Sequence, residues 1–465
     1  MKLHFLIILS VLLDFPAFSQ SRSLTVAMEK LAADEQFANA SIALSVREAE
    51  TGMEVYQLNG NLGVNPASSQ KVVTSASAFQ LLGKEFRFNT RLALADMQGG
   101  KGQMLVVTGA GDPTLGSDRW KYTRAEQVFS TILNMLKQNN VKELPGGIYI
   151  GNPKFSYQPL PHGWIWEDIG NYFGAGAWGF NWKENVFEID MVPGKDEGDP
   201  VTVTATRPAW MMETITSFVT TGERGSGDKS LVFSAPYQQN IFITGSVPAG
   251  SPNTNSGSLP DPAASFGREL SEFLQRAGII CGEVQTLGEA IRKGKVPSIE
   301  NSKQLADLRS PPLDSMNYWF MNKSINLYGE AFIKMIALQQ NKEASTTNGI
   351  DIVREFWKEK GIAPGELKIG DGSGLSPTNR VTSNGLVKVM EYAQTRPWFN
   401  SFYAGIPTMN NMKLKSGYMQ GVRSYTGIIT SRGGKKYLVA FVINNFHGSA
   451  AAVRQKMWKI LDELL

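Results

Sequence analysis

The chain has 465 residues, of which 42% are hydrophobic and 19% are charged, and its formal net charge is +4. This composition indicates a globular protein of two or more domains and excludes a disordered or fibrous chain. The positive charge is small and is not concentrated in a basic run, so we expect no nucleic-acid partner. The single cysteine, Cys281, excludes an internal disulfide.

Residues 1–19 have the pattern of an export signal. Lys2 precedes an apolar run from Leu3 to Leu13, which is followed by a small-x-small cleavage site at residues 17–19. The run is too short to cross a bilayer, and no later stretch reaches the ~18–20 apolar residues that a span requires. We therefore expect an exported, periplasmic chain with at most peripheral membrane contact.

The pattern of apolar residues divides the rest of the chain into an N-terminal mixed segment, a β-rich segment and a later, mainly helical segment. Strand patterns at 41–46 and 53–57 precede a helical pattern that begins at Ser68. Residues 84–261 contain short alternating strands, one clear helix at 124–136 and two linker-like stretches, 221–230 and 249–258. Later patterns predict helices at 263–277, 314–339, 348–360, 382–393 and 451–465, with strands at 413–416, 425–430 and 437–443. We expect an α+β protein in which one mixed domain, residues 20–83 and 262–465, is split by a β-rich insertion, residues 84–261.

Ser68 and Lys71 form an S-x-x-K motif at the start of the first helical pattern. Residues three apart lie on one helix face, so the amine can reach the hydroxyl. A serine becomes a good nucleophile when a base takes its proton, and a partly desolvated lysine can act as that base. Pro66 suits a helix start, where the helix dipole favours negative charge by roughly 0.3–1 kcal/mol. A second copy, Ser226 to Lys229, lies in a Gly/Ser/charged stretch that we interpret as a loop.

Two further motifs follow in chain order. Ser324-Ile325-Asn326 lies in a helical stretch, and Lys415-Ser416-Gly417 closes a strand, although Ser315-Met316-Asn317 is a competing S-x-N. S-x-x-K, S-x-N and K-[ST]-G in this order form the signature of penicillin-binding proteins and serine β-lactamases. The sequence has no G-x-S-x-G and no H-E-x-x-H or Cys/His cluster, which disfavours a Ser-His-Asp hydrolase and a zinc peptidase. We expect no cofactor and no metal.

The context of these motifs extends over the mature chain. It comprises residues 66–72, 321–330, 371–376 with Asn379, 415–417 with 420–422, and residues 111–115 and 163–168 between Lys71 and Ser324. Together with the long separation of Lys71 from Ser324, this context resembles the class C low-molecular-mass penicillin-binding proteins. These are D-alanyl-D-alanine carboxypeptidases and endopeptidases of the penicillin-binding protein 4 type. The resemblance implies a β-lactamase/transpeptidase-like domain, an antiparallel sheet flanked by helices, carrying a large insertion.

The resemblance also implies a role for each motif. Ser68 would attack the D-Ala–D-Ala carbonyl of a peptidoglycan stem peptide and form an acyl-enzyme, with Lys71 as its base. Ser324 would relay a proton to the leaving amine, and Asn326 would hold the substrate amide and Lys71. Lys415 would supply positive charge near Ser324 and the substrate carboxylate. β-Lactam antibiotics would be covalent inhibitors.

The remaining expected contacts concern substrate binding. The oxyanion would lie between the backbone N–H groups of Ser68 and Tyr418. Ser416, which keeps a hydroxyl, Gly417 and Tyr418 would bind the substrate. Tyr418 stands where the family usually has a Ser or Thr that helps to bind the terminal carboxylate. Asp168, which follows Trp164 and Trp166, either faces the substrate, as in the family, or belongs to a structural aromatic segment. Residues 371–376 are expected to support the site rather than to react.

Two other functions were weighed against a DD-peptidase. A β-lactamase or esterase on the same scaffold is disfavoured by the long insertion. A non-catalytic peptidoglycan-binding protein is disfavoured by the complete set of reactive side chains, which a binding protein does not need. Carboxypeptidase and endopeptidase activity, the diamino acid at stem-peptide position three, and the oligomeric state stay open.

Overall fold

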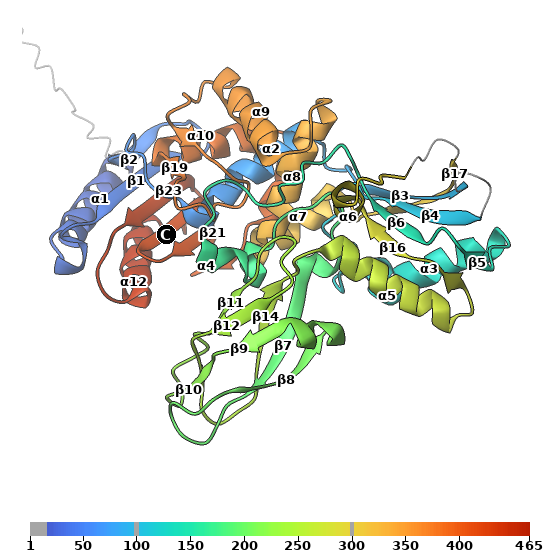
Figure 1. The fold of residues 1–465 in the computed structure, drawn as a ribbon. Helices are drawn as coiled ribbons and strands as arrows, with labels where there is room; N and C mark the ends of the chain where they lie inside the picture. Colours follow the sequence, from blue (N-terminus) through green and yellow to red (C-terminus); the bar gives the residue numbers. More distant parts are fainter. Residues whose placement is uncertain (1–15, 97–101, 298–301) are drawn as a thin grey trace, which may run out of the picture.

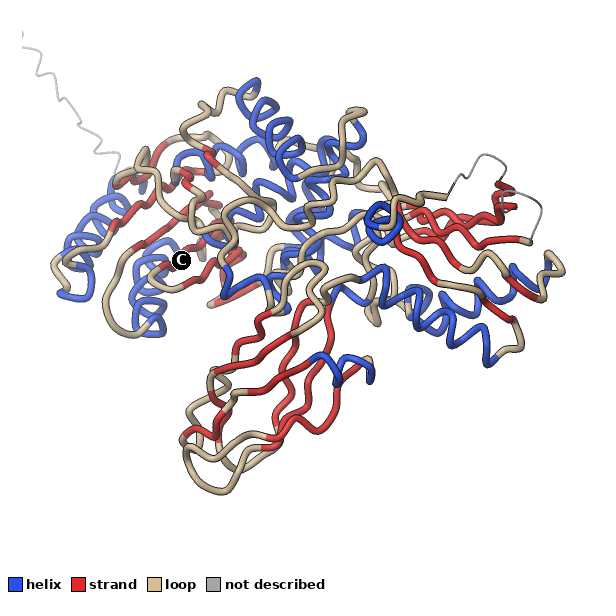
Figure 2. The backbone as a smooth tube through the Cα atoms, in the orientation of Figure 1, coloured by secondary structure: helices blue, strands red, loops and turns tan. Residues whose placement is uncertain are grey.

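The computed structural model describes residues 16–96, 102–297 and 302–465. Most of the predicted export signal therefore lies outside the described residues, and helix α1 (Pro16–Ala32) begins near its end. Within the described ranges, no helix is long and apolar enough to cross a membrane. The strands gather in three separate parts of the molecule, as Figure 2 shows.

The first part is an antiparallel six-stranded sheet in the order β2-β1-β23-β22-β21-β20. It joins strands from both ends of the chain, because Ser41 pairs with Asn444 across β1 and β23. The central strand β23 is buried at nearly every position, which explains its continuous apolar sequence. Its strands are β1 (Ser41–Glu48), β2 (Glu54–Leu58), β20 (Thr408–Met409), β21 (Met412–Met419), β22 (Val422–Thr430) and β23 (Lys436–Asn444).

Helices cover both faces of this sheet (Figure 1). On one face α1 packs with α12 (Ala450–Leu461) against Leu44, Val439 and Phe441. The other face carries the larger core, built on Ala43, Ala440 and a group of helices. These helices are α2 (Lys71–Leu81), α7 (Leu313–Asn322), α8 (Asn326–Gln339), α9 (Thr346–Glu359), α10 (Ser383–Gln394) and α11 (Phe399–Gly405).

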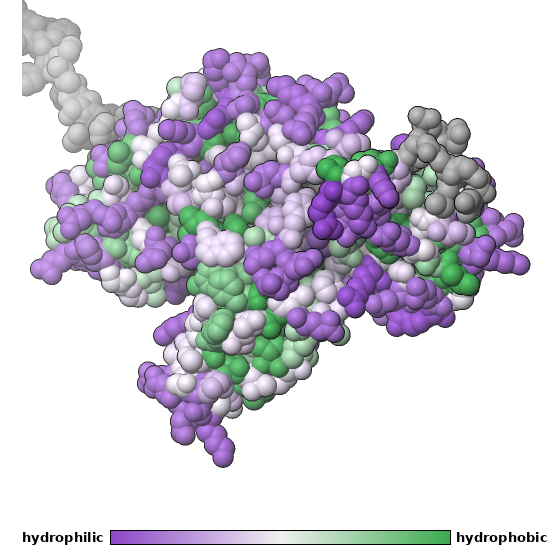
Figure 3. Space-filling view, viewed as in Figure 1, coloured by the Kyte–Doolittle hydropathy of each residue, from purple (hydrophilic) through white to green (hydrophobic). Residues whose placement is uncertain are grey.

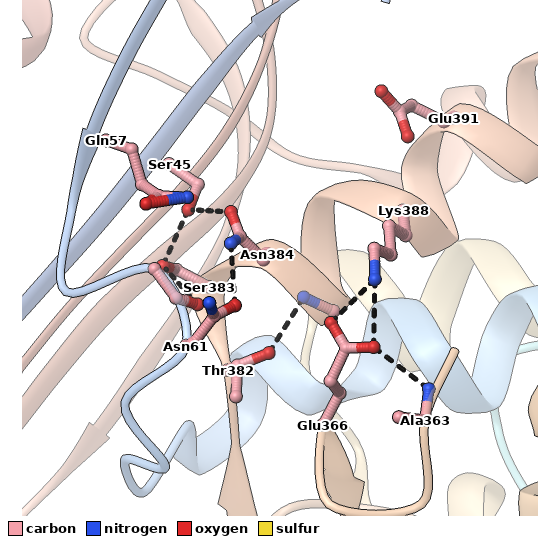
Figure 4. Close-up of polar contacts among 12 residues, drawn as sticks. Ser45, Gln57, Asn61, Ala363, Glu366, Thr382, Ser383, Asn384, Lys388 and Glu391 are labelled. Atoms are coloured by element: carbon pink, nitrogen blue, oxygen red, sulfur yellow. Dashed lines mark hydrogen bonds and ion pairs between the residues drawn. The ribbon is translucent and has the colours of Figure 1, made fainter. Parts of the chain in front are cut away.

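Buried polar contacts fix the start of α10 against the sheet (Figure 4). The hydroxyl of Ser45 on β1 donates to Oδ1 of Asn384 at 2.7 Å, and Nδ2 of Asn384 donates to Oδ1 of Asn61 at 2.9 Å. Thr382 caps the helix by accepting a hydrogen bond from the Gly385 N–H at 2.9 Å. These contacts hold the N-terminal end of α10 at a fixed position over β1.

A second sheet has the order β16-β6-β4-β3-β17. Its strands are β3 (Asn89–Asp96), β4 (Gln103–Thr108), β6 (Ile148–Gly151), β16 (Val284–Thr286) and β17 (Ser302–Arg309), and it packs on α3 (Ala125–Gln138) and α5 (Pro262–Arg276). The short helix α6 (Leu287–Arg292) follows β16, and β5 (Glu143–Leu144) pairs with β15 (Ile280–Cys281). Residues 262–297 and 302–309 therefore pack with the insertion, whereas the predicted boundary at 261 assigns them to the domain of the first sheet. We propose that the insertion extends to about residue 309.

The third part is a smaller β-structure with its own apolar core around Phe187, Val232 and Ile243. It contains β7 (Val186–Val192), β8 (Thr202–Arg207), β9 (Ile215–Ser217), β10 (Thr220–Gly222), β11 (Leu231–Phe233), β12 (Ile241–Thr244), β13 (Ser246–Pro248) and β14 (Asn253–Ser258). Figure 3 shows a hydrophilic far tip and apolar residues on the face nearer the rest of the molecule.

One of the two linker predictions for this part was wrong. Residues 253–258 form β14, which pairs antiparallel with β7 along its whole length. The strand is polar, Asn-Thr-Asn-Ser-Gly-Ser, so it has no apolar alternation from which it could be recognised. Residues 223–230 do form a loop, and it contains the second S-x-x-K copy, Ser226 to Lys229.

Candidate active site

Ser68 lies in a tight turn that leads into α2. Residues Ala67–Gln70 form a 3₁₀ turn, and Lys71 is the first residue of the α-helix. Ser69 holds the turn through a hydrogen bond from its hydroxyl to the Pro66 carbonyl at 2.8 Å. Ser68 is partly exposed, whereas its neighbours in the turn are buried. Its hydroxyl therefore lies at the surface of an otherwise closed core.

The Lys71 amine is the centre of the site. Its side chain is fully buried. Nζ donates to the Ser68 hydroxyl at 2.9 Å, to Oδ1 of Asn326 at 2.6 Å and to the Ser373 carbonyl at 2.7 Å. Burial lowers the pKa of Lys71 well below its usual value, and the Lys415 charge lowers it further. A neutral amine in this position can take the Ser68 proton.

Ser324 and Asn326 lie at a break between two helices. The single helix predicted over 314–339 was wrong, because α7 ends at Asn322 and α8 begins at Asn326. Ser324 has φ +59°, a left-handed conformation that cannot continue an α-helix. The turn brings Oδ1 of Asn326 to Lys71, while Nδ2 donates to the Phe173 carbonyl at 2.7 Å. The insertion thus contributes a backbone group to the site.

Lys415 reaches the same centre from β21. Its Nζ donates to the Ser324 hydroxyl at 3.0 Å and to the Ser416 carbonyl at 2.9 Å. Burial lowers the pKa of Lys415 to about 7. Gly417 allows the strand to approach the turn of Ser68, because a Cβ there would lie 2.9 Å from the Ser68 nitrogen and 2.3 Å from the Ser424 hydroxyl. No larger residue fits at this position.

Asp371 supports the floor of the site. It is fully buried, and one of its carboxylate oxygens accepts the indole N–H of Trp164 at 2.9 Å. Gly374, at φ +81°, packs against the carbonyl of Ala67 in the Ser68 turn. The other donors to this carboxylate are the side chains of Gln70 and Asn379 and the backbone N–H groups of Gly374 and Ser376. These contacts fit the supporting role predicted for 371–376.

Two buried charges on α8 were missed by the sequence analysis. Glu330 and Lys334 follow Asn326 at intervals of four, so all three lie on one helix face. Both Glu330 oxygens accept the Gly372 N–H at 3.0 Å, and burial together with Asp371 raises the pKa of Glu330 to about 8. Polar residues spaced by four in an otherwise apolar helix were the available signal.

Lys334 connects α8 to the insertion by hydrogen bonds. Its amine donates to the carbonyls of Gln158, Pro159 and Ala177 at 2.9, 3.3 and 2.6 Å. Burial lowers its pKa to about 8. The segment it holds includes Phe173, whose carbonyl orients Asn326. Lys334 therefore positions the insertion beside the site.

Asp168 lies in α4 (Trp166–Ile169), on the segment that leads to Phe173. Its carbonyl packs against Gly174, where a Cβ would approach to 2.0 Å. The carboxylate is partly buried, and this burial, with the nearby Glu167, raises its pKa.

Tyr418, on β21, is exposed, unlike the buried residues of the site. Its side chain is 59% exposed, and the Arg423 guanidinium lies 5.0 Å from its ring centroid.

The competing motif does not belong to the site. Asn317 is buried in α7, and its Oδ1 accepts a hydrogen bond from the Ser75 hydroxyl at 2.6 Å. The structure therefore brings together Ser68, Lys71, Ser324, Asn326 and Lys415, with Ser416 and Gly417 next to Lys415 on β21. A Ser–Lys pair completed by these groups on this α+β fold defines the penicillin-binding protein and serine β-lactamase class.

Comparison with known proteins places the chain within that class. Residues 24–464 match the D-Ala-D-Ala carboxypeptidase 3 (S13) family, and the chain belongs to this family. It is a serine D-Ala-D-Ala carboxypeptidase that acts on peptidoglycan. The family and fold class predicted from the sequence are confirmed.

The similarity to relatives named D-alanyl-D-alanine carboxypeptidase extends over most of the chain. A D-alanyl-D-alanine carboxypeptidase of Actinomadura sp. (strain R39) is 28% identical over 438 residues, 87% of this chain and 78% of its own. The D-alanyl-D-alanine carboxypeptidase DacB of Haemophilus influenzae is 27% identical over 418 residues, 83% of this chain and 82% of its own. The crystal structure of penicillin binding protein 4 (dacB) from H. influenzae has a TM-score of 0.78 at 21% identity, covering 94% of this chain and 99% of that one.

Proposed function

We propose that Ser68 is the nucleophile and Lys71 its general base. The Ser68 oxygen attacks the carbonyl carbon between the two D-alanines as Nζ of Lys71 takes the hydroxyl proton. The single observation that carries this assignment is the 2.9 Å contact between a buried amine and a partly exposed hydroxyl. A buried amine of lowered pKa is neutral often enough at working pH to accept that proton.

The second step needs a proton at the leaving nitrogen. Ser324, which lies 3.0 Å from Nζ of Lys415, is proposed to relay to the amine of the departing D-alanine the proton that Lys71 took from Ser68, so that Lys71 returns to its neutral form. The C–N bond then breaks and leaves an ester between Ser68 and the peptide. Water hydrolyses the ester, returning the hydroxyl proton to Ser68 and releasing the shortened stem peptide.

Backbone groups are proposed to stabilise the oxyanion. The N–H groups of Ser68 and Tyr418 are the donors, and the close approach of Gly417 to the Ser68 nitrogen supports this pairing. One such donor contributes ~10²–10³ in rate. The exposed Tyr418 ring lies under Arg423, so we propose that Lys415 and Ser416, rather than the phenol, bind the terminal carboxylate.

β-Lactams are proposed to acylate Ser68 in the same way, because their ring amide presents a comparable carbonyl. A solved H. influenzae penicillin binding protein 4 complexed with a β-lactam has a TM-score of 0.72 and 20% identity to this chain, covering 95% of it and 98% of its own chain. The export-signal pattern of residues 1–19 supports action in the periplasm. We further propose that peptide cross-links are cleaved, since they contain the same D-Ala carbonyl.

Digestion of purified muropeptides tests the proposal. Mass spectrometry should show loss of one alanine from pentapeptides with wild-type protein and no loss with Ser68→Ala. Conversion of cross-linked dimers to monomers in the same digest would establish endopeptidase activity. Retention of alanine release by Ser68→Ala would disprove the nucleophile assignment.

A further inference from the structure

A groove of about 790 Å³ lies where the smaller β-structure meets the five-stranded sheet. Its walls come from the 3₁₀ helix Ala209–Thr214, residues 237–241, the start of α5 and helix α6. None of the residues proposed for catalysis lines it. Figure 1 shows α5 running from the smaller β-structure to the second sheet, so the groove lies at a junction of two parts. Such junctions are frequent sites of ligand binding.

Aromatic side chains line this groove. Tyr157 and Tyr237 are both 49% exposed, and Trp210 has the Arg268 guanidinium 5.1 Å from its ring centroid. The indole nitrogen of Trp210 is buried and has no hydrogen-bond acceptor among the described residues. A buried donor without an acceptor is unfavourable. Because that nitrogen has almost no accessible surface, the aromatic surface open to a ligand is that of the two tyrosines.

Tyr237 is held in a strained conformation. Its φ of +64° is one that a tyrosine rarely adopts. Its N–H donates to the Pro260 carbonyl at 2.8 Å, and its ring packs edge to face on Trp178 with centroids 5.0 Å apart. Strained residues that the surroundings fix in place are frequent at ligand sites. The wall of the groove is therefore preorganised.

The polar lining indicates the kind of ligand. Gln239 and Asn240 offer exposed amides, while Arg268 and Arg292 stand beside Glu213 and other carboxylates. Because both signs of charge are present, the lining does not favour a strongly anionic or strongly cationic ligand. A sugar ring has an apolar C–H face for an aromatic ring and a rim of hydroxyls for amides and carboxylates. An N-acetyl group adds one donor and one acceptor for the exposed amides of Gln239 and Asn240.

We propose that this groove binds a short stretch of N-acetylated amino sugars, a segment of the glycan strand; the choice of peptidoglycan as its source rests on the proposed function. One wall of the groove is joined to the catalytic part of the molecule by a short chain segment. Tyr157 is followed by Gln158, whose carbonyl accepts from Lys334 on α8. Glycan held there would keep polymeric substrate on the enzyme, so the groove would favour polymeric over free peptide substrates.

Binding can be measured without any chemistry. The Ser68→Ala protein is titrated by calorimetry with the β-1,4-linked tetramer of N-acetylglucosamine. Tyr157→Ala in the same background should weaken saturable binding by about threefold to tenfold, from loss of one stacking contact. Tyr122→Ala is the matched control, because Tyr122 is also 49% exposed and lies outside the groove.

The same substitutions are then compared in active protein. Tyr157→Ala should lower kcat/KM for glycan strands that carry pentapeptides by a similar factor and leave free pentapeptide unchanged. Absence of saturable binding, equal weakening by Tyr122→Ala, or displacement of the sugar by free pentapeptide would overturn the proposal. Because the titration uses inactive protein, its outcome is independent of whether Ser68 is the nucleophile.

Discussion

The side-chain nitrogen of Asn326 donates to the backbone carbonyl of Phe173 at 2.7 Å. The other end of the same amide accepts from Lys71 at 2.6 Å. The Asn326 carboxamide therefore hydrogen-bonds to the insertion through its nitrogen and to Lys71 of the catalytic part through its oxygen. The two hydrogen bonds together fix its orientation. The insertion is in this way a component of the active centre, and it must be held at a defined distance from α8.

The first prediction concerns Lys334, which supplies that restraint through three carbonyls. Lys334→Met leaves buried acceptors without donors, so we expect the free energy of unfolding to fall by at least ~1–3 kcal/mol. Urea denaturation measures this change. We also expect slower penicillin acylation, because Phe173 would no longer orient Asn326.

Lys342→Met provides the comparison, since Lys342 is exposed just beyond the same helix. Its stability and acylation rate should match those of wild type. If Lys334→Met behaves like Lys342→Met, the three carbonyl contacts do not hold the insertion in place.

The second prediction is covalent labelling at Ser68. Fluorescent penicillin should label wild-type protein, and Ser68→Ala should abolish the label. The reason is that Nζ of Lys71 lies 2.9 Å from the Ser68 hydroxyl and has no such contact with Ser226, the serine of the second S-x-x-K copy. Ser226→Ala, in the second copy, should be labelled normally. Peptide mass mapping identifies the acylated residue, and a label on any other serine contradicts the assignment.

The third prediction separates the two lysines. Lys71→Arg should nearly eliminate acylation, because a guanidinium cannot give up its proton to act as a base. Lys415→Arg should keep partial activity, since its proposed role needs positive charge near Ser324. Stopped-flow measurement of penicillin acylation compares the two variants. Equal and mild losses would be inconsistent with these roles.

The fourth prediction is a falling limb in the pH profile. The pKa of Lys415 is lowered to about 7, so its ammonium form, needed for the substrate carboxylate, is lost as pH rises above that value. The value of kcat/KM for a D-Ala-D-Ala peptide should therefore fall above about pH 7. Lys71 acts as the neutral amine, and burial lowers its pKa, so deprotonation of Lys71 contributes the opposite, rising limb.

Lys415→Arg should remove the falling limb between pH 7 and 9, because a guanidinium stays charged there. Lys413→Arg, two residues earlier on β21, should retain it. Persistence of the falling limb in Lys415→Arg would assign it to another group.

Much of the site could be predicted because short motifs specify it directly. The spacing of Ser68 and Lys71 fixes their contact through local helix geometry. The strand that carries Lys415, Ser416 and Gly417 was predicted from its apolar pattern, although it continues to Met419 and does not close at this motif. The break at Ser324 could not be predicted, because apolar periodicity runs on through it and only the backbone reveals the left-handed residue.

Long-range contacts explain the other failures. The carbonyl of Phe173 reaches Asn326 across a distance in sequence that no local pattern encodes. Strand β17 is half-exposed and pairs with β3 far earlier in the chain, and on this pairing rests our proposal of a later end for the insertion than the sequence pattern predicts. Polar β14 is defined by its partner β7 and not by its own composition. In each case tertiary pairing decides the structure.

The last prediction is that Asp168 selects the substrate and does not take part in bond cleavage. Its carboxylate is partly buried, and its pKa is raised, so a cationic partner would stabilise its charged form. The free amine of a diamino acid in the stem peptide is such a partner. One charge-assisted hydrogen bond of this kind contributes ~1.5–3 kcal/mol, or roughly tenfold to a hundredfold in selectivity.

Asp168→Asn should therefore lower kcat/KM for diamino-acid peptides by about that factor, while penicillin acylation, which needs no stem peptide, stays near wild type. Glu167→Gln is the control, because it removes a neighbouring exposed carboxylate from the same short helix. It should leave peptide selectivity unchanged. If penicillin acylation of Asp168→Asn falls as steeply as peptide hydrolysis, Asp168 instead supports the segment that carries Phe173 to Asn326.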